Sequence, residues 1–287
     1  MKPPQIFLHP NYCEEGQSLE CFFQLASDLG VDGVELRRTR PDWPDTDSYL
    51  TEILRLKEKY GTQNIVFGGK DINLVDSDHV NRRSSLDEAL EFYRKASEIL
   101  GVRLFNIFTG YLKNQTCGEN EYERHGSAVA SEEVFHWQAD GLKEVASLMD
   151  KIDSYFVFET HPGYVHDLPS STMKLVEMVG SPRAGVLLDY ANLLLWPNPP
   201  GFNESISLIG KKLRYIHLKN IILYDNRMFK MTSLGDGQIN HRQLLRGLIS
   251  TNFQGPICLE AARPGDGEWF AKQDLKYLRE TLDAISF

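Results

Sequence analysis

Four apolar stretches in the second half of the chain decide the fold: FVFETHPG (156–163), GVLLDYAN (185–192), YIHLKN (215–220) and ICLEAARPG (257–265). Each is a run of Val, Ile, Leu, Phe or Cys that ends among polar residues, and the polar residues are Glu159, Asp189, His217 and Glu260. Buried parallel strands have this composition, and in a barrel of alternating strands and helices the carboxyl ends of the strands face the active site. The four stretches therefore predict four strands that present one shared site.

The same alternation of short apolar runs and longer amphipathic segments extends over the whole chain, which is typical of parallel strands joined by crossover helices. We expect strands over 5–9, 33–37, 64–68, 104–108, 155–160, 185–189, 215–219 and 256–261. We expect helices over 18–29, 46–60, 85–100, 132–149, 170–179, 204–209, 242–250 and 269–285. Because no linker or charge block interrupts the pattern, the sequence predicts an α/β protein, a single (β/α)8 TIM barrel in one domain over residues 1–287.

A doubly wound open sheet is the competing architecture. It usually carries a glycine-rich phosphate-binding turn after its first strand, and the chain contains neither a GxGxxG nor a GxxxxGK[ST] motif. The sequence therefore favours the closed barrel.

The amino-acid composition of the chain restricts the kinds of partner that the protein is expected to bind. The formal net charge of −9 disfavours nucleic acid, which needs a basic surface. No run of about 18 apolar residues predicts a membrane span, and the four cysteines form no CxxC pair. We therefore expect a cytoplasmic protein with free thiols, a small-molecule partner, no nucleic-acid or membrane partner, and the option of a homo-oligomer.

The strand-end residues are of metal-ligand type. Any one of them taken alone is an ordinary polar residue where a buried strand reaches the surface. Together, three carboxylates and an imidazole suit one divalent ion, with Mn²⁺ preferred and Mg²⁺, Co²⁺ or Zn²⁺ as alternatives. Such an ion leaves positions for adjacent substrate oxygens, so Glu159, Asp189, His217 and Glu260 predict a metal site for a small carbohydrate-like substrate.

Strand periodicity adds two catalytic candidates. Side chains at i and i+2 share a face, so His161 projects beside Glu159 and Lys219 beside His217. His161 is a candidate general base and Lys219 a candidate oxyanion partner, while Glu159 and Glu260 can double as acid and base. The alternatives are a loop histidine before a proline and a lysine paired with a ligand carboxylate.

Arginines and one long connection provide substrate-binding candidates. Arg37 is the last residue of strand 33–37, and Arg263 lies three residues after Glu260; either could clamp a carboxylate or phosphate, or be a solvated surface arginine. The stretch 111–131 exceeds the normal length of a connection and could be a lid. Residues 234–238, LGDGQ, read as a flexible turn near the site.

These residues resemble the xylose isomerase-like TIM-barrel superfamily, whose sugar isomerase, epimerase and dehydratase branches carry a Glu, Asp, His, Glu metal quartet on strands five to eight. The motifs ETHP (159–162), LPSST (168–172) after Asp167, and HLKN (217–220) look most like the 3-dehydroshikimate dehydratase branch. In that branch the histidine of the ETHP motif is thought to be the base, a role that the resemblance assigns to His161.

Two positions depart from the dehydratase branch. Where that branch carries a strand-four arginine for the substrate carboxylate, this chain has Asn106, and where it tends to have a histidine after the strand-six aspartate, this chain has Asn192. Both asparagines are predicted to bind substrate, and the substrate is expected to differ. The DNA-repair branch of the superfamily needs further histidines on strands three and four. In this chain those strands read IVFGG (65–69) and FNIFT (105–109) and contain no histidine, so the sequence and its acidic charge disfavour a DNA-repair function.

The sequence thus leads to three hypotheses. The first is a metal-dependent isomerase or epimerase that abstracts a proton α to a carbonyl on a small keto-sugar or polyhydroxy oxo-acid. The second is a metal-dependent lyase that uses the same proton abstraction, either a dehydratase or a 3-oxo-acid decarboxylase. The third is a noncatalytic barrel that serves as a binding module or subunit.

Overall fold

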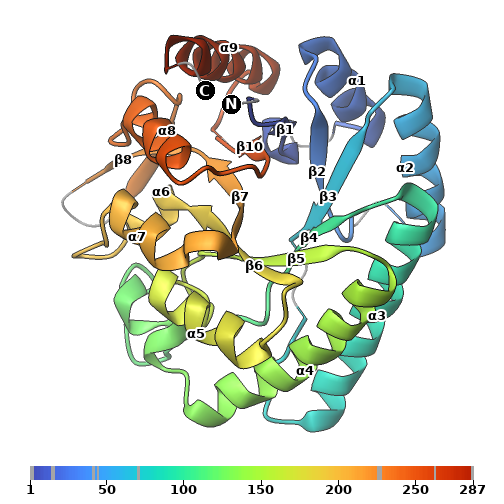
Figure 1. Cartoon of the computed structure of the whole chain (residues 1–287), viewed down its shortest axis with the longest axis vertical. Helices are drawn as coiled ribbons and strands as arrows, with labels where there is room; N and C mark the ends of the chain where they lie inside the picture. Colours follow the sequence, from blue (N-terminus) through green and yellow to red (C-terminus); the bar gives the residue numbers. More distant parts are fainter. Residues whose placement is uncertain are drawn as a thin grey trace. The chain divides into compact units, whose positions relative to one another are not determined.

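A computed structural model of the chain describes residues 3–13, 17–40, 43, 45–69, 72–224, 228–261 and 263–285. Its parallel strands (Figure 1) are β1 (Ile6–Leu8), β2 (Gly33–Arg37), β3 (Asn64–Gly68), β4 (Leu104–Asn106), β5 (Tyr155–Glu159), β6 (Ala184–Asp189), β7 (Leu213–Leu218) and β10 (Ile257–Leu259). In these described ranges they form a closed barrel in the order β1-β10-β7-β6-β5-β4-β3-β2. The predicted (β/α)8 barrel is confirmed.

Helices follow the strands along the chain. They are α1 (Leu19–Leu29), α2 (Thr46–Tyr60), α3 (His79–Leu100), α4 (Glu132–Lys151), α5 (Pro169–Val179), α6 (Tyr190–Leu193), α7 (Phe202–Ile209), α8 (His241–Ser250) and α9 (Gly267–Ile285). Among the helices described, none is both long enough and apolar enough to cross a membrane.

The start of α3 differs most from the predicted helix bounds. α3 begins at His79 rather than at Ser85, because the Asp78 carboxylate accepts a hydrogen bond from the Val80 N–H at 2.8 Å and caps the helix there. The early turns of α3 are largely exposed and polar, so they lack the apolar repeat from which a helix is predicted.

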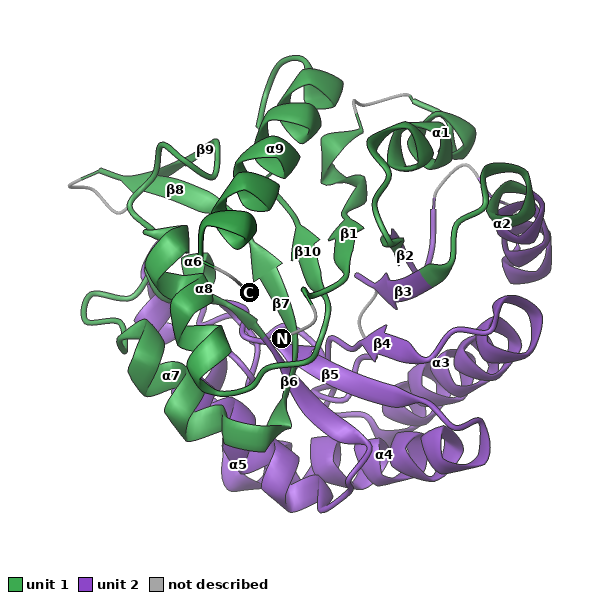
Figure 2. Cartoon of the chain, turned by 45° about the horizontal axis from the view of Figure 1, so that its top comes forward, with its two compact units in different colours: residues 1–35, 56–64, 188–287 green, residues 36–55, 65–187 purple. Residues whose placement is uncertain are grey.

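The chain divides into two compact units (Figure 2). Unit 1 comprises residues 1–35, 56–64 and 188–287, and unit 2 comprises residues 36–55 and 65–187. Within unit 1, parallel pairing joins β7 to β10, β10 to β1, and β1 to the first residues of β2. Within unit 2 it joins β3 to β4, β4 to β5, and β5 to β6. The single domain over 1–287 stays a prediction, and its residues 1–2 and 286–287 lie outside the described ranges.

A hairpin that the sequence analysis did not predict follows β7 in unit 1. Its antiparallel strands are β8 (Asn220–Leu223) and β9 (Phe229–Thr232). The fully buried Asn220 side chain donates to the carbonyls of Leu234 and Ile239 at 2.8 and 3.0 Å, and its Oδ1 accepts from the Ile239 N–H at 2.9 Å. The Asn220 side chain therefore holds the backbone at both ends of the predicted flexible turn 234–238, at Leu234 and at Ile239.

The long connection 111–131 is ordered and belongs to unit 2. It contains two short 3-10 turns, Tyr122–Arg124 and Gly126–Ala128. The Leu112 N–H donates to the carbonyl of Gly163 at 2.7 Å, and the Ser127 N–H donates to Oδ2 of Asp167 at 2.9 Å. These bonds tie both ends of the segment to the loop after β5, and its role as a lid stays a prediction.

Candidate metal centre

Unit 1 brings three of the predicted ligands together. Asp189 ends β6, His217 lies in β7, and Glu260 follows β10. Each offers one potential ligand atom, and these atoms lie within 4.8 Å of one another. Asp189 is fully buried, and only 3% of the surface of His217 is exposed. Two carboxylates and an imidazole at this spacing form a buried cluster suited to a hard or borderline divalent ion.

The Asp189 carboxylate is fixed by the backbone that follows it. Its Oδ1 accepts hydrogen bonds from the N–H groups of Ala191 at 3.0 Å and Asn192 at 3.2 Å, so Asp189 also caps the α6 turn. Its Oδ2 lies 2.5 Å from Nζ of Lys219. Burial raises the pKa of Asp189, and the positive charge of Lys219 opposes this shift. Asn192 is buried in the same turn, and its predicted contact with substrate stays a prediction.

His217 stands between two carboxylates. Its Nδ1 lies 2.9 Å from Oε2 of Glu260, and its Nε2 lies 2.8 Å from Oε2 of Glu35. The Tyr215 hydroxyl donates to the same Glu35 oxygen at 2.8 Å. A carboxylate behind a histidine, with the other ring nitrogen facing the ligand cluster, is the arrangement that orients metal-binding histidines.

Glu35 was missed from the sequence, although it is the acid within the apolar run GVELR of β2. It is 2% exposed. Burial alone would raise its pKa, but the charge of His217 and the hydrogen bonds from His217 and Tyr215 lower it. Glu35 is therefore a charged partner inside the barrel, and an acid among buried strand residues was the signal available for finding it.

Glu260 contacts a lysine and an asparagine besides His217. Its Oε2 lies 3.4 Å from Nζ of Lys219, and its Oε1 accepts a hydrogen bond from Nδ2 of Asn11 at 3.2 Å. Burial would raise the pKa of Glu260, but the positive charges of Lys219 and His217 hold it well below its ordinary value. Lys219 thus makes ion pairs with two predicted ligands, and its catalytic role stays a prediction.

Unit 2 carries the fourth predicted ligand. Glu159, 3% exposed, ends β5, and its Oε2 accepts a hydrogen bond from Nδ2 of Asn106 at 3.2 Å. The backbone carbonyl of Glu159 accepts a hydrogen bond from Nδ1 of His166 at 2.6 Å. The buried His166 ring is stacked on Phe158 and on Tyr164, and burial lowers its pKa to about 4, so it is neutral at ordinary pH. Nothing in the sequence around His166 distinguished it from an ordinary loop histidine.

His161 is also in unit 2. Its Nδ1 lies 3.0 Å from the carbonyl oxygen of Pro162, and a carbonyl only accepts, so Nδ1 carries the proton. In the neutral ring, Nε2 is then the nitrogen with the lone pair. The ring packs edge-on against Phe108 and Tyr164. A neutral ring of this tautomer can accept a proton at Nε2.

The two predicted arginines lie in different surroundings. Arg37 is exposed at the end of β2, and its backbone carbonyl accepts a hydrogen bond from the Tyr49 hydroxyl at 2.9 Å. Arg263 is anchored: its Nη1 donates to Asp274 at 2.7 Å and to the Thr232 carbonyl at 3.1 Å. Its guanidinium also lies over the ring of Phe270. Substrate binding by either arginine stays a prediction.

The chain is a TIM barrel, a parallel eight-stranded barrel, with a buried cluster of carboxylates and histidine that could hold a metal ion. The chain belongs to the xylose isomerase-like TIM barrel family, whose sequence profile matches residues 23–281. The predicted family is thereby confirmed. None of the curated proteins compared with the chain matches it in sequence.

Solved structures share the fold at low sequence identity. D-allulose 3-epimerase from Methylomonas sp., in complex with D-allulose, is 16% identical, with a TM-score of 0.75 over 97% of this chain and 98% of that one. The probable 3-DHS dehydratase AsbF from Bacillus anthracis is 18% identical, with a TM-score of 0.72 over 96% and 98%. A xylose isomerase-like protein from Mycobacterium smegmatis, in complex with magnesium, is 16% identical, with a TM-score of 0.75 over 98% and 97%. At these identities the likeness shows the fold.

Proposed function

We propose that the protein is a divalent-metal-dependent enzyme that removes a proton next to the carbonyl of a neutral keto-sugar and acts as an isomerase or epimerase. Its proposed ligands are Glu159, Asp189, His217 and Glu260. Glu159 pairs in register with Leu187 of β6, two residues before Asp189, and residues two apart on a strand share a face. This register supports the addition of Glu159 to the three ligands that unit 1 brings together.

The donor set fits a divalent ion. Carboxylate oxygens and one imidazole are the ligands of Mn²⁺ and Mg²⁺ sites, and the Glu35–His217 contact supplies the outer support that such sites have. We propose Mn²⁺, and the related barrel that binds magnesium is compatible with an ion of this kind. A bound divalent ion would stabilise the negative charge that develops on adjacent substrate oxygens when the proton leaves.

The chain's own residues handle the protons. Glu159 and Glu260 are proposed as acid and base on opposite faces of the substrate, and the hydrogen bond from Asn106 holds the Glu159 carboxylate in one orientation. Lys219 is a cation beside two carboxylates, so it can donate a hydrogen bond to a substrate oxygen as charge develops there. His161, with its lone pair on Nε2, is proposed to exchange a proton with a neighbouring hydroxyl.

The Asp189, His217 and Glu260 cluster carries the proposal of a metal-dependent enzyme. The choice of a neutral keto-sugar is supported by Asn106, a buried amide bonded to Glu159 at the position where the dehydratase branch is expected to carry an arginine for a carboxylate. A neutral sugar needs no such clamp. The D-allulose complex of the related epimerase is consistent with this choice.

A lyase is the second candidate, and the geometry of His161 favours it. The Pro162 carbonyl holds the proton on Nδ1 and leaves the lone pair on Nε2, which fits the role of base that the resemblance to the dehydratase branch gives this histidine. In that case the proton abstraction would be followed by loss of water or carbon dioxide.

One experiment separates the candidates. The Mn²⁺-loaded protein would be incubated in deuterated buffer with a panel of ketoses and 3-oxo acids, and the products analysed by NMR and mass spectrometry. Deuterium uptake with an unchanged molecular formula supports the isomerase or epimerase, and loss of water or carbon dioxide supports the lyase. Protein treated with a chelator and the variant Glu159→Gln serve as controls. No bound metal, and ligand binding unchanged in Glu159→Gln, would point to a noncatalytic barrel.

A further inference from the structure

Hydrogen bonds rather than packing fix the carboxylate of Glu260. Among the three ligands that unit 1 brings together it is the most exposed, with 13% of its side chain accessible against 0% for Asp189 and 1% for His217. Its two oxygens have different partners: Oε2 lies 2.9 Å from Nδ1 of His217, whereas Oε1 accepts a hydrogen bond from Nδ2 of Asn11 at 3.2 Å. One oxygen therefore faces the ligand cluster, and the other faces the segment after β1.

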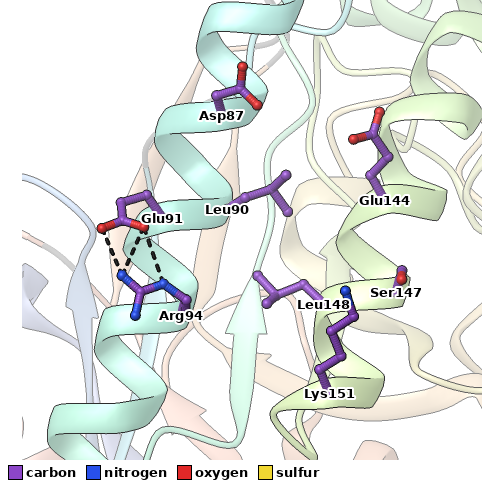
Figure 3. A pocket seen from close by; sticks show the side chains of 8 residues that line it. All are labelled: Asp87, Leu90, Glu91, Arg94, Glu144, Ser147, Leu148 and Lys151. Atoms are coloured by element: carbon purple, nitrogen blue, oxygen red, sulfur yellow. Dashed lines mark hydrogen bonds and ion pairs between the residues drawn. The ribbon is translucent and has the colours of Figure 1, made fainter.

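A surface glutamate shows the contrast (Figure 3). In the groove between α3 and α4, Nη2 of Arg94 lies 2.8 Å from Oε1 and 2.9 Å from Oε2 of Glu91, so one exposed partner holds both oxygens. Exposed pairs of this kind contribute little to stability. In the centre, Nζ of Lys219 also lies on the Oε2 side of Glu260, at 3.4 Å. The surroundings therefore distinguish the two oxygens of Glu260, and Oε2 is the one beside His217 and Lys219.

The segment that carries Asn11 is anchored at its start. It is a 3-10 turn, Pro10–Tyr12, that follows β1, and β1 pairs with β10 (Figure 2). The His9 N–H donates to the carbonyl of Leu259 at 3.0 Å and extends this pairing by one residue. The ring of the buried His9 then accepts a hydrogen bond on Nδ1 from the Asn11 N–H at 3.1 Å. These bonds fix the backbone of Asn11 relative to the end of β10.

Tyr12 anchors the other end of the turn. Its side chain is 2% exposed, and its hydroxyl donates to Oδ2 of Asp274 at 2.8 Å. The same hydroxyl accepts a hydrogen bond from the N–H of Ala261, the residue after Glu260, at 3.3 Å. A side chain held between two anchored neighbours loses little further freedom when it makes a hydrogen bond of its own. Asn11 is thus preorganised to hold the carboxylate of Glu260 in one orientation.

We propose that Asn11 is a positioning residue that keeps Oε1 of Glu260 away from the metal ion, so that Glu260 binds the ion through Oε2 alone. A carboxylate binds a divalent ion through one oxygen or through both. When each of the four proposed ligands supplies one atom, a six-coordinate ion keeps two positions, which adjacent oxygens of a keto-sugar require. This inference rests on the proposed function for the ligand set and for the substrate.

The test counts the water molecules on the ion. The relaxation of water protons, measured by NMR on Mn²⁺-loaded protein, increases with the number of exchangeable waters that each Mn²⁺ binds. Asn11→Leu keeps the approximate size of the side chain and removes the amide, so Oε1 should turn to the ion and the enhancement per bound ion should fall to about half. The matched control is Asn81→Leu on α3. Asn81 is exposed and donates to Oδ2 of Asp76 at the same distance of 3.2 Å, and its loss should change nothing at the ion.

Asn11→Ala, which adds no apolar bulk, should show the same fall, and calorimetric titration of the same samples should show no loss of Mn²⁺ affinity in either variant. An unchanged enhancement per bound ion, with or without weaker Mn²⁺ binding, reduces Asn11 to a structural role and overturns the inference. An enhancement in the unchanged protein that corresponds to a single water overturns it as well, without any variant. A halved enhancement in a protein that converts no ketose or 3-oxo acid would instead overturn the proposed function and keep the role of Asn11, and absence of Mn²⁺ binding would overturn both.

Discussion

Glu35 is expected to set the metal affinity of the centre although it is not a proposed ligand. The substitution Glu35→Gln keeps the size of the side chain and an oxygen that can accept from Tyr215, but removes the charge that faces Nε2 of His217 at 2.8 Å. Loss of such a partner typically lowers metal affinity 10- to 100-fold, or about 1.4 to 2.7 kcal/mol. We expect a loss in this range, because the Glu35–His217 pair is buried and poorly screened.

The assay is calorimetric titration of metal-free protein with Mn²⁺. The matched control is Glu280→Gln, an exposed glutamate on α9 that lies 3.8 Å from Lys276, and it should bind Mn²⁺ as the unchanged protein does. Unfolding by urea, followed in the same samples, separates a weakened centre from a weakened fold. A dissociation constant for Glu35→Gln within about twofold of the control would refute the role assigned to this carboxylate.

Three further predictions concern proton release on metal binding, the pH dependence of stability, and the stabilising role of Arg263. Both ring nitrogens of His217 face carboxylate oxygens, so a doubly protonated ring donates a hydrogen bond to each carboxylate. Binding of Mn²⁺ should therefore release about one proton per ion. Identical binding enthalpies in buffers of different ionisation enthalpy would contradict this. Burial raises the pKa of Asp167 to about 6, so the free energy of unfolding should fall by up to about 3 kcal/mol as pH rises from about 4 to 6. Asp167→Asn should lack that slope in urea titrations, and an unchanged slope would count against the buried-acid explanation. Arg263→Met should lower stability by about 3 kcal/mol by leaving the buried Asp274 charge without its guanidinium, whereas a raised KM at unchanged stability would favour substrate binding.

Much of the barrel could be predicted because its signals are local. β2 and β3 have the predicted bounds, and α2 does as well, since apolar strand runs and a 3.6-residue repeat depend on neighbours along the chain. The hairpin β8–β9 could not be predicted in this way. It is organised by Asn220, whose hydrogen bonds reach residues 14 and 19 positions later.

The candidate metal centre could likewise be predicted only in part. The sequence by itself determined the residue types at four strand ends and hence the class of ion they suit. Tertiary structure decided which side chains support them: Glu35 is 182 residues from His217, and Arg263 turned out to be anchored on Asp274. A ligand type is a property of one residue, whereas burial, orientation and charge pairing arise only when segments distant in the chain are brought within hydrogen-bond distance.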